Sequence, residues 1–311
     1  MTRIFDAGET ASRLPYHELA ESIREVVLAM SSGELQAPPR LVLSLSDGGV
    51  LLVMPASDQE ISITKLVTVH PDNPGRSLPT IQGEVVVMKA ATGERLGLLE
   101  GSVVTARRTA ALSMLAAREL APHPGGPLLV IGAGTQGRSH LEAFREGLGV
   151  SKIFITSRSG NSATSLAEHA RSVGLDARAV DRPEDVLDEV SLVVTATTSR
   201  QPVLPDEVPH GTFVAAVGSF EPEAAELSPA LISTAQVFVD SMEGAKEEAG
   251  DLIQAARAGA FRWEDTTTLE DALRSSWRPD GTVVFKSVGH ALWDLAAART
   301  VFVGPSGSDV S

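Results

Sequence analysis

The spacing of hydrophobic positions changes near residue 121. Before that point, a helical spacing over 16–30 precedes short runs rich in β-branched residues, and an alanine-rich helical stretch over 102–120 follows them. The runs lie at 41–45, 49–55, 61–69 and 83–90. The first 120 residues therefore predict mixed α+β structure.

Beyond the Pro- and Gly-rich segment 121–127, short apolar strands alternate with helical segments. The expected strands lie at 127–132, 152–156, 177–180, 191–197, 212–218 and 236–240, with another within 278–287. Near-continuous apolar strands separated by helices are typical of a parallel sheet that is covered on both faces. We therefore predict a doubly wound α/β domain over 121–287, followed by a helix from 289 to about 301.

Composition limits the partners. The 311 residues carry a formal net charge of −14, which repels phosphate backbones and anionic lipid, so neither nucleic acid nor a membrane is expected as a partner. The absence of a long apolar run and of a signal-peptide core predicts a cytoplasmic location. Cysteine is absent and no His, Asp and Glu residues have metal-ligand spacing, so no metal site is expected.

A glycine-rich loop follows the first strand of the second part. Gly132, Gly134 and Gly137 form a G-x-G-x-x-G pattern, with Thr135 and Gln136 between the last two glycines, and the loop opens a helix expected over Gln136–Leu148. The first glycine permits a tight turn, the second lets the backbone approach a pyrophosphate, and the third packs helix against strand. The helix N-terminus attracts phosphate. The loop predicts dinucleotide binding, and the alternative is a purely structural turn.

The next strand ends in Ser157, Arg158 and Ser159, about 20 residues past the loop. Sites that prefer NAD usually place Asp or Glu there, to accept from the ribose 2′-hydroxyl. An arginine flanked by hydroxyls suits a 2′-phosphate instead, which predicts NADP(H) in preference to NAD(H). The alternative is that Arg158 is only an exposed turn residue.

Further cofactor contacts are expected where strands end, because ligands of doubly wound sheets bind at the carboxyl edge. Thr197 follows one strand, Val217 ends the next, and Ser219 lies just beyond it. Each could instead be an ordinary loop residue.

Six segments, in order, carry a family pattern. They are Pro38-Pro39-Arg40, Thr64-Lys65-Leu66-Val67, Leu78-Pro79-Thr80, Thr105–Ala111, Gly132–Gly137, and Phe285–Gly289 with Asp294-Leu295-Ala296. Together they resemble the ornithine cyclodeaminase/μ-crystallin family. The resemblance implies a homodimer whose dimerisation and substrate domain, 1–120 completed by 288–311, receives the Rossmann domain 121–287 as an insertion. It also implies a nicotinamide cofactor, with Ser287 in a cofactor-facing segment, and a small α-amino or α-imino carboxylate substrate.

Arg40, Lys65 and Arg108 match the family positions that hold the substrate carboxylate, and Thr80 matches a position near the substrate. The residue types agree, since a guanidinium can bind a carboxylate bidentately and an ammonium in an apolar strand needs an anion. Lys65 and Arg108 are the expected catalytic residues, with Lys65 either assisting this binding or relaying a proton. The alternatives are a solvated strand residue for Lys65 and a surface charge for Arg108.

Phe220 marks a departure from the family's cyclodeaminases, which carry an aspartate in a Val-Gly-x-Asp-x-Pro segment. Phenylalanine can neither accept a proton nor bind an ammonium through a carboxylate, and Glu221 is one residue out of register. This segment also resembles the family's reductases. We expect Phe220 to face an apolar substrate ring, and the alternative is that it only packs.

These features favour NADPH-dependent reduction of a cyclic ketimine carboxylate, Δ1-pyrroline-2-carboxylate and/or Δ1-piperideine-2-carboxylate, to proline or pipecolate. The cofactor would supply the hydride and the protein the orientation. One alternative is an NAD-dependent ornithine cyclodeaminase, which forms proline and ammonia, and another is an alanine dehydrogenase. A third is a non-catalytic, crystallin-like NADPH-binding protein.

Overall fold

The computed structural model describes residues 3–275 and 278–304, and the chain divides into two compact units. The first comprises residues 1–108 and 291–311, and the second comprises residues 109–290. The division falls inside a helix rather than at the Pro- and Gly-rich segment after it. The functional domain limits expected at 120 and 287 stay a prediction, and residues 1–2, 276–277 and 305–311 of those domains lie outside the described residues.

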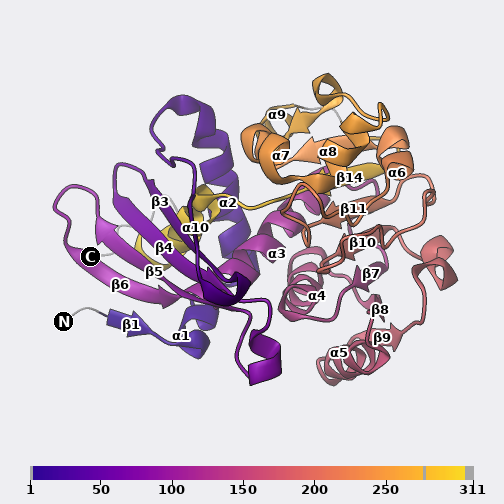
Figure 1. Ribbon diagram of the computed structural model, residues 1–311, viewed down its shortest axis with the longest axis horizontal. Helices are drawn as coiled ribbons and strands as arrows, with labels where there is room; N and C mark the ends of the chain where they lie inside the picture. The colour runs from indigo at the N-terminus through magenta and orange to yellow at the C-terminus, as the bar shows by residue number, and fades with distance from the viewer. Residues whose placement is uncertain (1–2, 276–277, 305–311) are drawn as a thin grey trace. The chain divides into compact units, whose positions relative to one another are not determined.

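The first unit contains a six-stranded sheet of order β1-β6-β5-β4-β3-β2 (Figure 1). Its strands are β1 (Arg3–Phe5), β2 (Leu41–Ser44), β3 (Val50–Ser57), β4 (Ile61–Val69), β5 (Ile81–Lys89) and β6 (Arg95–Glu100). Only the β1–β6 pair is parallel among the described strands of this sheet. The sheet therefore combines parallel and antiparallel pairs, and with its helices this unit has the mixed α+β structure that the sequence predicts.

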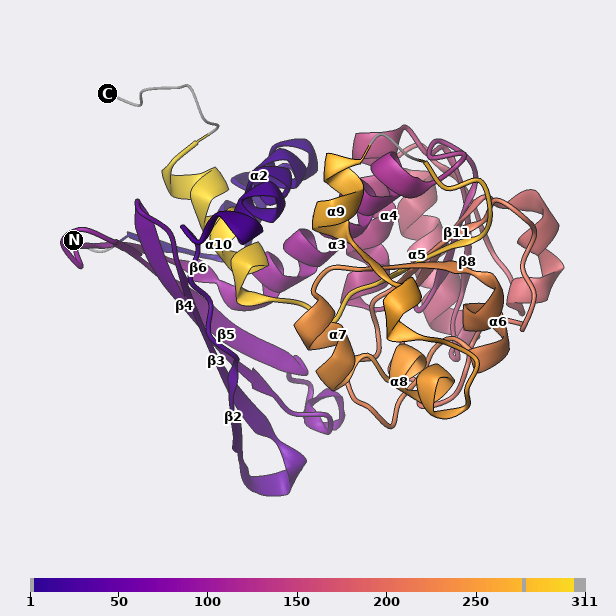
Figure 2. The ribbon, with the colours of Figure 1, turned by 90° about the horizontal axis from the view of Figure 1, so that it is seen from above.

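Helices α2 (Tyr16–Ala29) and α10 (Ala291–Phe302) pack against each other, and α10 also contacts β3 and β4. Figure 2 shows both helices on the same side of the sheet. The other helical segments of this unit are α1 (Ala7–Ser12), η1 (Met30–Ser32), η2 (Ser46–Gly48), η3 (Asn73–Arg76) and the first part of α3 (Gly101–Leu120). α2 buries one apolar face, as its helical spacing predicts, whereas α10 is buried along most of its length.

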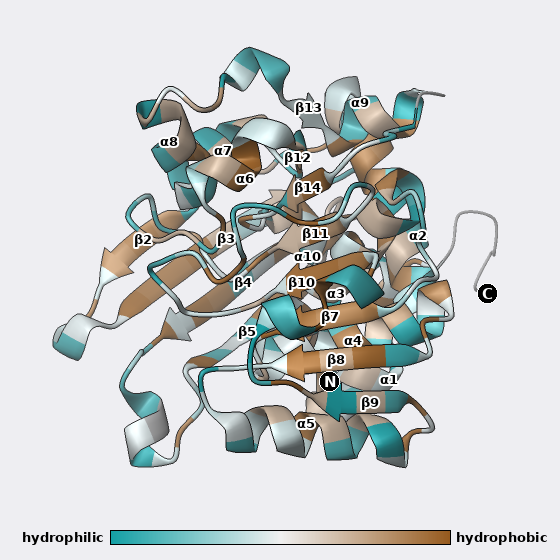
Figure 3. Cartoon of the chain, turned by 90° about the vertical axis from the view of Figure 1, so that its right-hand side faces the viewer, coloured by the Kyte–Doolittle hydropathy of each residue, from teal (hydrophilic) through white to brown (hydrophobic). Residues whose placement is uncertain are grey.

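The second unit contains an eight-stranded parallel sheet of order β13-β12-β14-β11-β10-β7-β8-β9. Its strands are β7 (Leu128–Ile131), β8 (Lys152–Thr156), β9 (Asp176–Ala179), β10 (Leu192–Thr195), β11 (Phe213–Ala216), β12 (Gln236–Val239), β13 (Thr267–Thr268) and β14 (Val283–Lys286). In Figure 3 the central strands are coloured as hydrophobic, whereas the edge strand β9 is largely hydrophilic. The expected doubly wound parallel sheet is confirmed.

Helices connect these strands. They are α4 (Thr135–Leu148), α5 (Gly160–Ser172), α6 (Pro229–Thr234), α7 (Met242–Glu248), α8 (Gly250–Arg257) and α9 (Leu269–Arg274), with short turns η4 (Pro183–Asp185), η5 (Leu187–Glu189) and η6 (Trp263–Asp265). The chain leaves β7 toward β8 on one side, and β10 pairs with β7 on the other. The strand order therefore reverses at β7, and ligands of open α/β sheets bind at such a point. Within the described residues, no helix is both long and apolar enough to cross a membrane.

Candidate functional site

A cavity of about 640 Å³ lies in the second unit, at the carboxyl ends of β7, β8 and β10. Its lining includes six of the predicted cofactor residues, namely Gly132, Gly134, Ser157, Arg158, Ser159 and Thr197. These residues come from three different connections in the chain. The structure thus gathers the predicted phosphate loop and the predicted ribose-binding residues around one space.

The three glycines of the loop differ in what surrounds them. At Gly132 the φ angle is +111°, and a Cβ there would lie 2.3 Å from the Ala196 carbonyl oxygen. A Cβ at Gly137 would lie 1.9 Å from the Gly132 carbonyl oxygen, whereas a Cβ at Gly134 would meet nothing within 4 Å. Two glycines are therefore required by packing, and the third leaves its backbone open to the cavity.

Thr135 and Gln136 form the first turn of α4. The residue before this turn is Gly134, which has no side chain that could cap the first N–H groups. The first N–H groups of a helix have no partner within the helix, and a bound anion can satisfy them. This arrangement suits a phosphate group at the opening of α4.

The part of the cavity that Arg158 and Asp181 line carries charges of both signs. Arg158 is exposed there, while the hydroxyl groups on either side of it have partners within the chain. Ser157 Oγ donates to the Ser159 carbonyl, 2.6 Å away, and Ser159 Oγ accepts from the N–H of Ser162 in α5. Sequence reasoning missed Asp181, which follows β9 and lines the same cavity. Only the spatial proximity of β8 and β9 reveals it.

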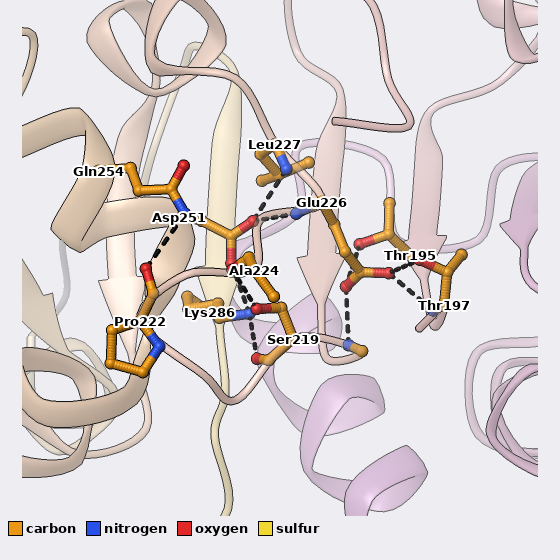
Figure 4. A network of polar contacts seen from close by, with 11 residues as sticks. Thr195, Thr197, Ser219, Pro222, Ala224, Glu226, Leu227, Asp251, Gln254 and Lys286 are labelled. Carbon is orange, nitrogen blue, oxygen red and sulfur yellow. Dashed lines mark hydrogen bonds and ion pairs between the residues drawn. The ribbon is translucent and has the colours of Figure 1, made fainter. Parts of the chain in front are cut away.

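Glu226, which sequence reasoning also missed, contacts the loops that follow β10 and β11 with its carboxylate (Figure 4). One carboxylate oxygen accepts from the N–H and the hydroxyl of Thr197, at 2.7 and 2.8 Å. The other accepts from Gly218 N–H at 2.7 Å and from Thr195 Oγ1 at 3.0 Å. Burial raises the pKa of Glu226, and the nearby charge of Lys286 opposes this rise.

A buried ion pair continues this network. Lys286 on β14 lies 2.6 Å from Asp251 on α8, and neither side chain is exposed. Asp251 Oδ1 also accepts from the N–H groups of Glu226 and Leu227, and Lys286 Nζ donates to the Ser219 carbonyl at 2.7 Å. The network therefore connects the strand β14, the helix α8 and the loop after β11.

The remaining predicted cofactor residues occupy this same region. The Val217 N–H donates to the Thr195 carbonyl, and Ser219 Oγ donates to the Ala224 carbonyl. Ser287 Oγ donates to Asp240 Oδ2 at 2.7 Å. Both serine hydroxyl protons have partners within the chain, so the roles of these three residues toward a cofactor stay predictions.

The predicted cation cluster lies in the first unit. β4 alternates between buried and partly exposed positions, and Lys65 falls on the buried side between Ile63 and Val67. Its strand neighbours Met54 on β3 and Val85 on β5 are also buried. The alternative of a solvated strand residue is therefore wrong for Lys65.

A carboxylate in α10 joins two of the cations. Asp294 Oδ2 lies 2.7 Å from Lys65 Nζ, and Asp294 Oδ1 lies 3.3 Å from Arg108 Nε. All three side chains are buried, which also excludes a surface charge for Arg108. The sequence signal for Asp294 is an acidic residue within the apolar helix, although sequence reasoning gave it no role.

Charges and burial together set the state of Lys65. Burial lowers its pKa from 10.5 to about 8, Asp294 opposes this change, and the charges of Arg108 and Arg40 add to it. Arg40 is half-buried just before β2. Lys65, Arg108 and Asp294 together leave an excess positive charge, which would attract an anion.

The positions of Thr80 and Phe220 do not decide whether either residue contacts a substrate. Thr80 is half-buried next to the start of β5, and its carbonyl accepts from the His70 N–H. Phe220 belongs to the second unit, follows β11 and is 45% exposed. Glu221 forms an ion pair with Arg200 at 2.9 Å.

No group of three or more His, Cys, Asp or Glu residues able to hold a metal occurs in the part of the chain that the structure describes.

Comparisons with known proteins agree with these features. The chain is 39% identical to a Δ1-pyrroline-2-carboxylate reductase 1 of Burkholderia multivorans and 38% identical to a Δ1-pyrroline-2-carboxylate/Δ1-piperideine-2-carboxylate reductase of Azospirillum brasilense. In both cases the match covers 96% of this chain and 94% of the relative. The Δ1-pyrroline-2-carboxylate reductase of Thermococcus litoralis, solved with NADH and L-proline, has a TM-score of 0.92 at 26% identity and covers 97% of both chains.

These relatives are named as reductases, which confirms the expectation of an enzyme of this kind. The model of one family matches residues 2–305, nearly the whole chain. The resemblance inferred from the six sequence segments is thereby confirmed. The protein belongs to the ornithine cyclodeaminase/mu-crystallin family.

Proposed function

We propose that the protein reduces a cyclic ketimine carboxylate with NADPH, forming proline from Δ1-pyrroline-2-carboxylate or pipecolate from Δ1-piperideine-2-carboxylate. The observation that carries this proposal is the buried cluster of Lys65, Asp294 and Arg108, which keeps excess positive charge in an apolar setting. The named activities of the relatives from Burkholderia and Azospirillum support the substrate class.

In this proposal Arg108 and Arg40 bind the substrate carboxylate and thereby orient the ring. A guanidinium group can hold a carboxylate through two parallel hydrogen bonds. Thr80 would contact the substrate at the edge of the same cluster, and Phe220 would contact its apolar ring. The excess positive charge also favours an anionic substrate group over a cationic one at this place.

Lys65 relays the proton that reduction of an imine requires. A bound reduced nicotinamide would supply a hydride to the imine carbon, and the nitrogen would gain one proton. Because the pKa of Lys65 is about 8, its ammonium holds a proton at neutral pH and releases it more readily than an ordinary lysine does. Asp294 keeps Nζ in place through the 2.7 Å ion pair.

The cavity of the second unit would hold the cofactor. Gly132 and Gly134, with the N–H groups of Thr135 and Gln136, suit the pyrophosphate, and Gly137 packs the helix against the loop. Arg158 supports NADP(H), since its exposed guanidinium can bind a 2′-phosphate. Asp181 and the NADH of the Thermococcus structure favour NAD(H) as the second candidate.

A homodimer is part of the same proposal. The edge strand β2 exposes Leu41, Val42 and Leu43 by 56%, 57% and 51%. Adjacent exposed apolar residues on an edge strand favour pairing with another chain. A second copy of this chain is the expected partner, and size-exclusion chromatography with light scattering would test this. The cytoplasmic location also stays a prediction.

The test of the activity uses purified protein with NADPH or NADH and a panel of substrates, followed by the absorbance of the reduced cofactor. We expect oxidation of NADPH with the two cyclic imines. Ammonia release from ornithine would instead indicate a cyclodeaminase, and turnover with pyruvate plus ammonium alone would indicate an alanine dehydrogenase. Tight NADPH binding without turnover of any substrate would indicate a storage role.

A further inference from the structure

Glu226 has a position that the proposed reaction does not explain. It lies in the second unit, fully buried, and does not line the cofactor cavity. Its carboxylate nevertheless binds the backbone of Thr197, a cavity residue that follows β10, and the backbone of Gly218, which follows β11. A single side chain thus couples two neighbouring loops at the carboxyl edge of the sheet.

The chemistry of these contacts requires a carboxylate. Each oxygen of Glu226 accepts one backbone N–H and one threonine hydroxyl. A hydroxyl group can rotate and accept, but a backbone N–H can only donate. A glutamine amide would therefore place its NH₂ group against Thr197 N–H or Gly218 N–H in either orientation. An ionised carboxylate, with about four acceptor sites, satisfies all four donors.

The two loops are also packed without free space between them. A Cβ added to Gly218 would lie 2.2 Å from the Thr197 carbonyl oxygen and 2.5 Å from Glu226 Oε1. The loops therefore approach each other closely because the carboxylate bridges them and because position 218 has no side chain. A change in the bridge would change the distance between the loops.

The backbone of Glu226 is fixed as well. Its N–H donates to Asp251 Oδ1 at 2.6 Å, and Asp251 forms the buried ion pair with Lys286. Lys286 in turn donates to the Ser219 carbonyl, in the same loop as Gly218 (Figure 4). The loop after β11 is thus bound twice. Gly218 donates directly to the Glu226 carboxylate, and Ser219 is connected through Lys286 and Asp251 to the Glu226 N–H.

We propose that Glu226 is a positioning residue for cofactor binding. Its carboxylate holds the loops after β10 and β11 in the arrangement that a bound nicotinamide dinucleotide needs, and it acts through Thr197 and Gly218. This inference rests on the proposed function only in that the cavity binds such a cofactor. It does not depend on which imine is reduced.

The main experiment measures the Kd of NADPH and of NADH by fluorescence titration of the full chain, without substrate. We expect Glu226→Gln to raise the Kd of the preferred nucleotide about ten-fold or more, since the variant leaves a buried N–H without an acceptor. Glu223→Gln is the matched control, because Glu223 is an exposed carboxylate of the same loop. It should bind as the wild type does, and wild-type affinity in Glu226→Gln would overturn the proposal.

The pH dependence separates positioning from a merely structural role. Protonation turns one oxygen of Glu226 into a donor, so cofactor affinity of the wild type should weaken as the pH falls. Lys286 and Asp251 are the charged groups that face Glu226 from β14 and α8, and both remain in the variant. We expect the Glu226→Gln profile to be flatter over the same range. Parallel profiles, with only a lower melting temperature in the variant, would contradict the proposal.

A second variant covers the case in which Glu226→Gln does not fold. Thr195 is fully buried, so it cannot touch the cofactor, and its hydroxyl donates to Glu226. Thr195→Val removes this one hydrogen bond and should raise the Kd about two- to five-fold. An unchanged Kd would overturn the role of Glu226. A wild-type protein that binds neither nucleotide would instead overturn the proposed function.

Discussion

Asp294 Oδ2 lies 2.7 Å from Lys65 Nζ, and both side chains are buried. The cluster that would bind the substrate anion therefore contains an anion of its own. The carboxylate offsets part of the repulsion among the cations and keeps the Lys65 ammonium from losing its proton too easily. This relationship leads to the first prediction.

Asp294→Asn should shift the alkaline limb of the reduction profile to lower pH. Lys65 donates only while protonated, so in the wild type the rate should fall as the pH rises through about 8. The Asp294 carboxylate raises the pKa of Lys65, and its removal lowers that pKa. The measurement is kcat/KM against pH with a cyclic imine. A limb at unchanged pH would show that Lys65 does not supply the proton.

Arg108→Ala should raise the KM of the substrate about 10- to 100-fold, because it removes charge-assisted hydrogen bonds to the carboxylate. Cofactor affinity should stay unchanged. Arg107→Ala is the matched control, since Arg107 donates to the Leu14 carbonyl and lies over the Tyr16 ring. It should lower the melting temperature and leave KM unchanged. Equal effects of both variants on KM would argue against the proposed carboxylate site.

Arg158→Ala and Asp181→Asn should change cofactor preference in opposite directions. The first removes the cation that would hold a 2′-phosphate and should raise the Kd of NADPH about ten-fold, with little effect on NADH. The second removes a negative charge from the same cavity and should tighten NADPH binding. Titration with both nucleotides checks this. If neither variant alters the ratio of the two Kd values, the ribose end of the cofactor lies elsewhere.

Asp251→Asn should strongly destabilise the protein, because it leaves Lys286 buried without its counterion. The expected loss in the free energy of unfolding is about 3–5 kcal/mol. Glu189→Gln is a control at the same distance, since Lys152 and Glu189 also lie 2.6 Å apart but are 40% and 45% exposed. It should cause no measurable change. Denaturant titration of both variants tests whether burial, rather than distance, decides the effect.

The sequence was most informative where one local pattern determines the outcome. The glycine spacing after an apolar run predicted the loop between β7 and α4. For Lys65 the sequence left a buried and a solvated position open, and only the structure shows that it lies on the buried face of β4. Glu226 and Asp181 could not be found in this way. Their surroundings come from strands and loops that only the tertiary fold brings together, and neither lies in a recognisable motif.

Asp294 is an intermediate case. An acidic residue in an apolar helix indicates a buried partner, but the partners Lys65 and Arg108 are more than a hundred residues away in the chain. For Phe220 the sequence shows only that the aspartate of the cyclodeaminases is absent. Which groups surround the phenyl ring depends on the fold and could not be predicted from the sequence. Its 45% exposure in a single chain leaves the expected substrate contact as a prediction.

Among the described residues β14 is the last strand, yet it lies between β11 and β12, and the helix α10 after it is buried against α2, β3 and β4 in the first unit. During synthesis, neither unit can therefore complete its hydrophobic core before residues 283–302 have been made. A nascent chain that stops before this segment would expose unpaired edges of β11 and β12 and an uncovered sheet at once. Ribosome-bound fragments should accordingly remain sensitive to protease until the final helix has emerged from the exit tunnel.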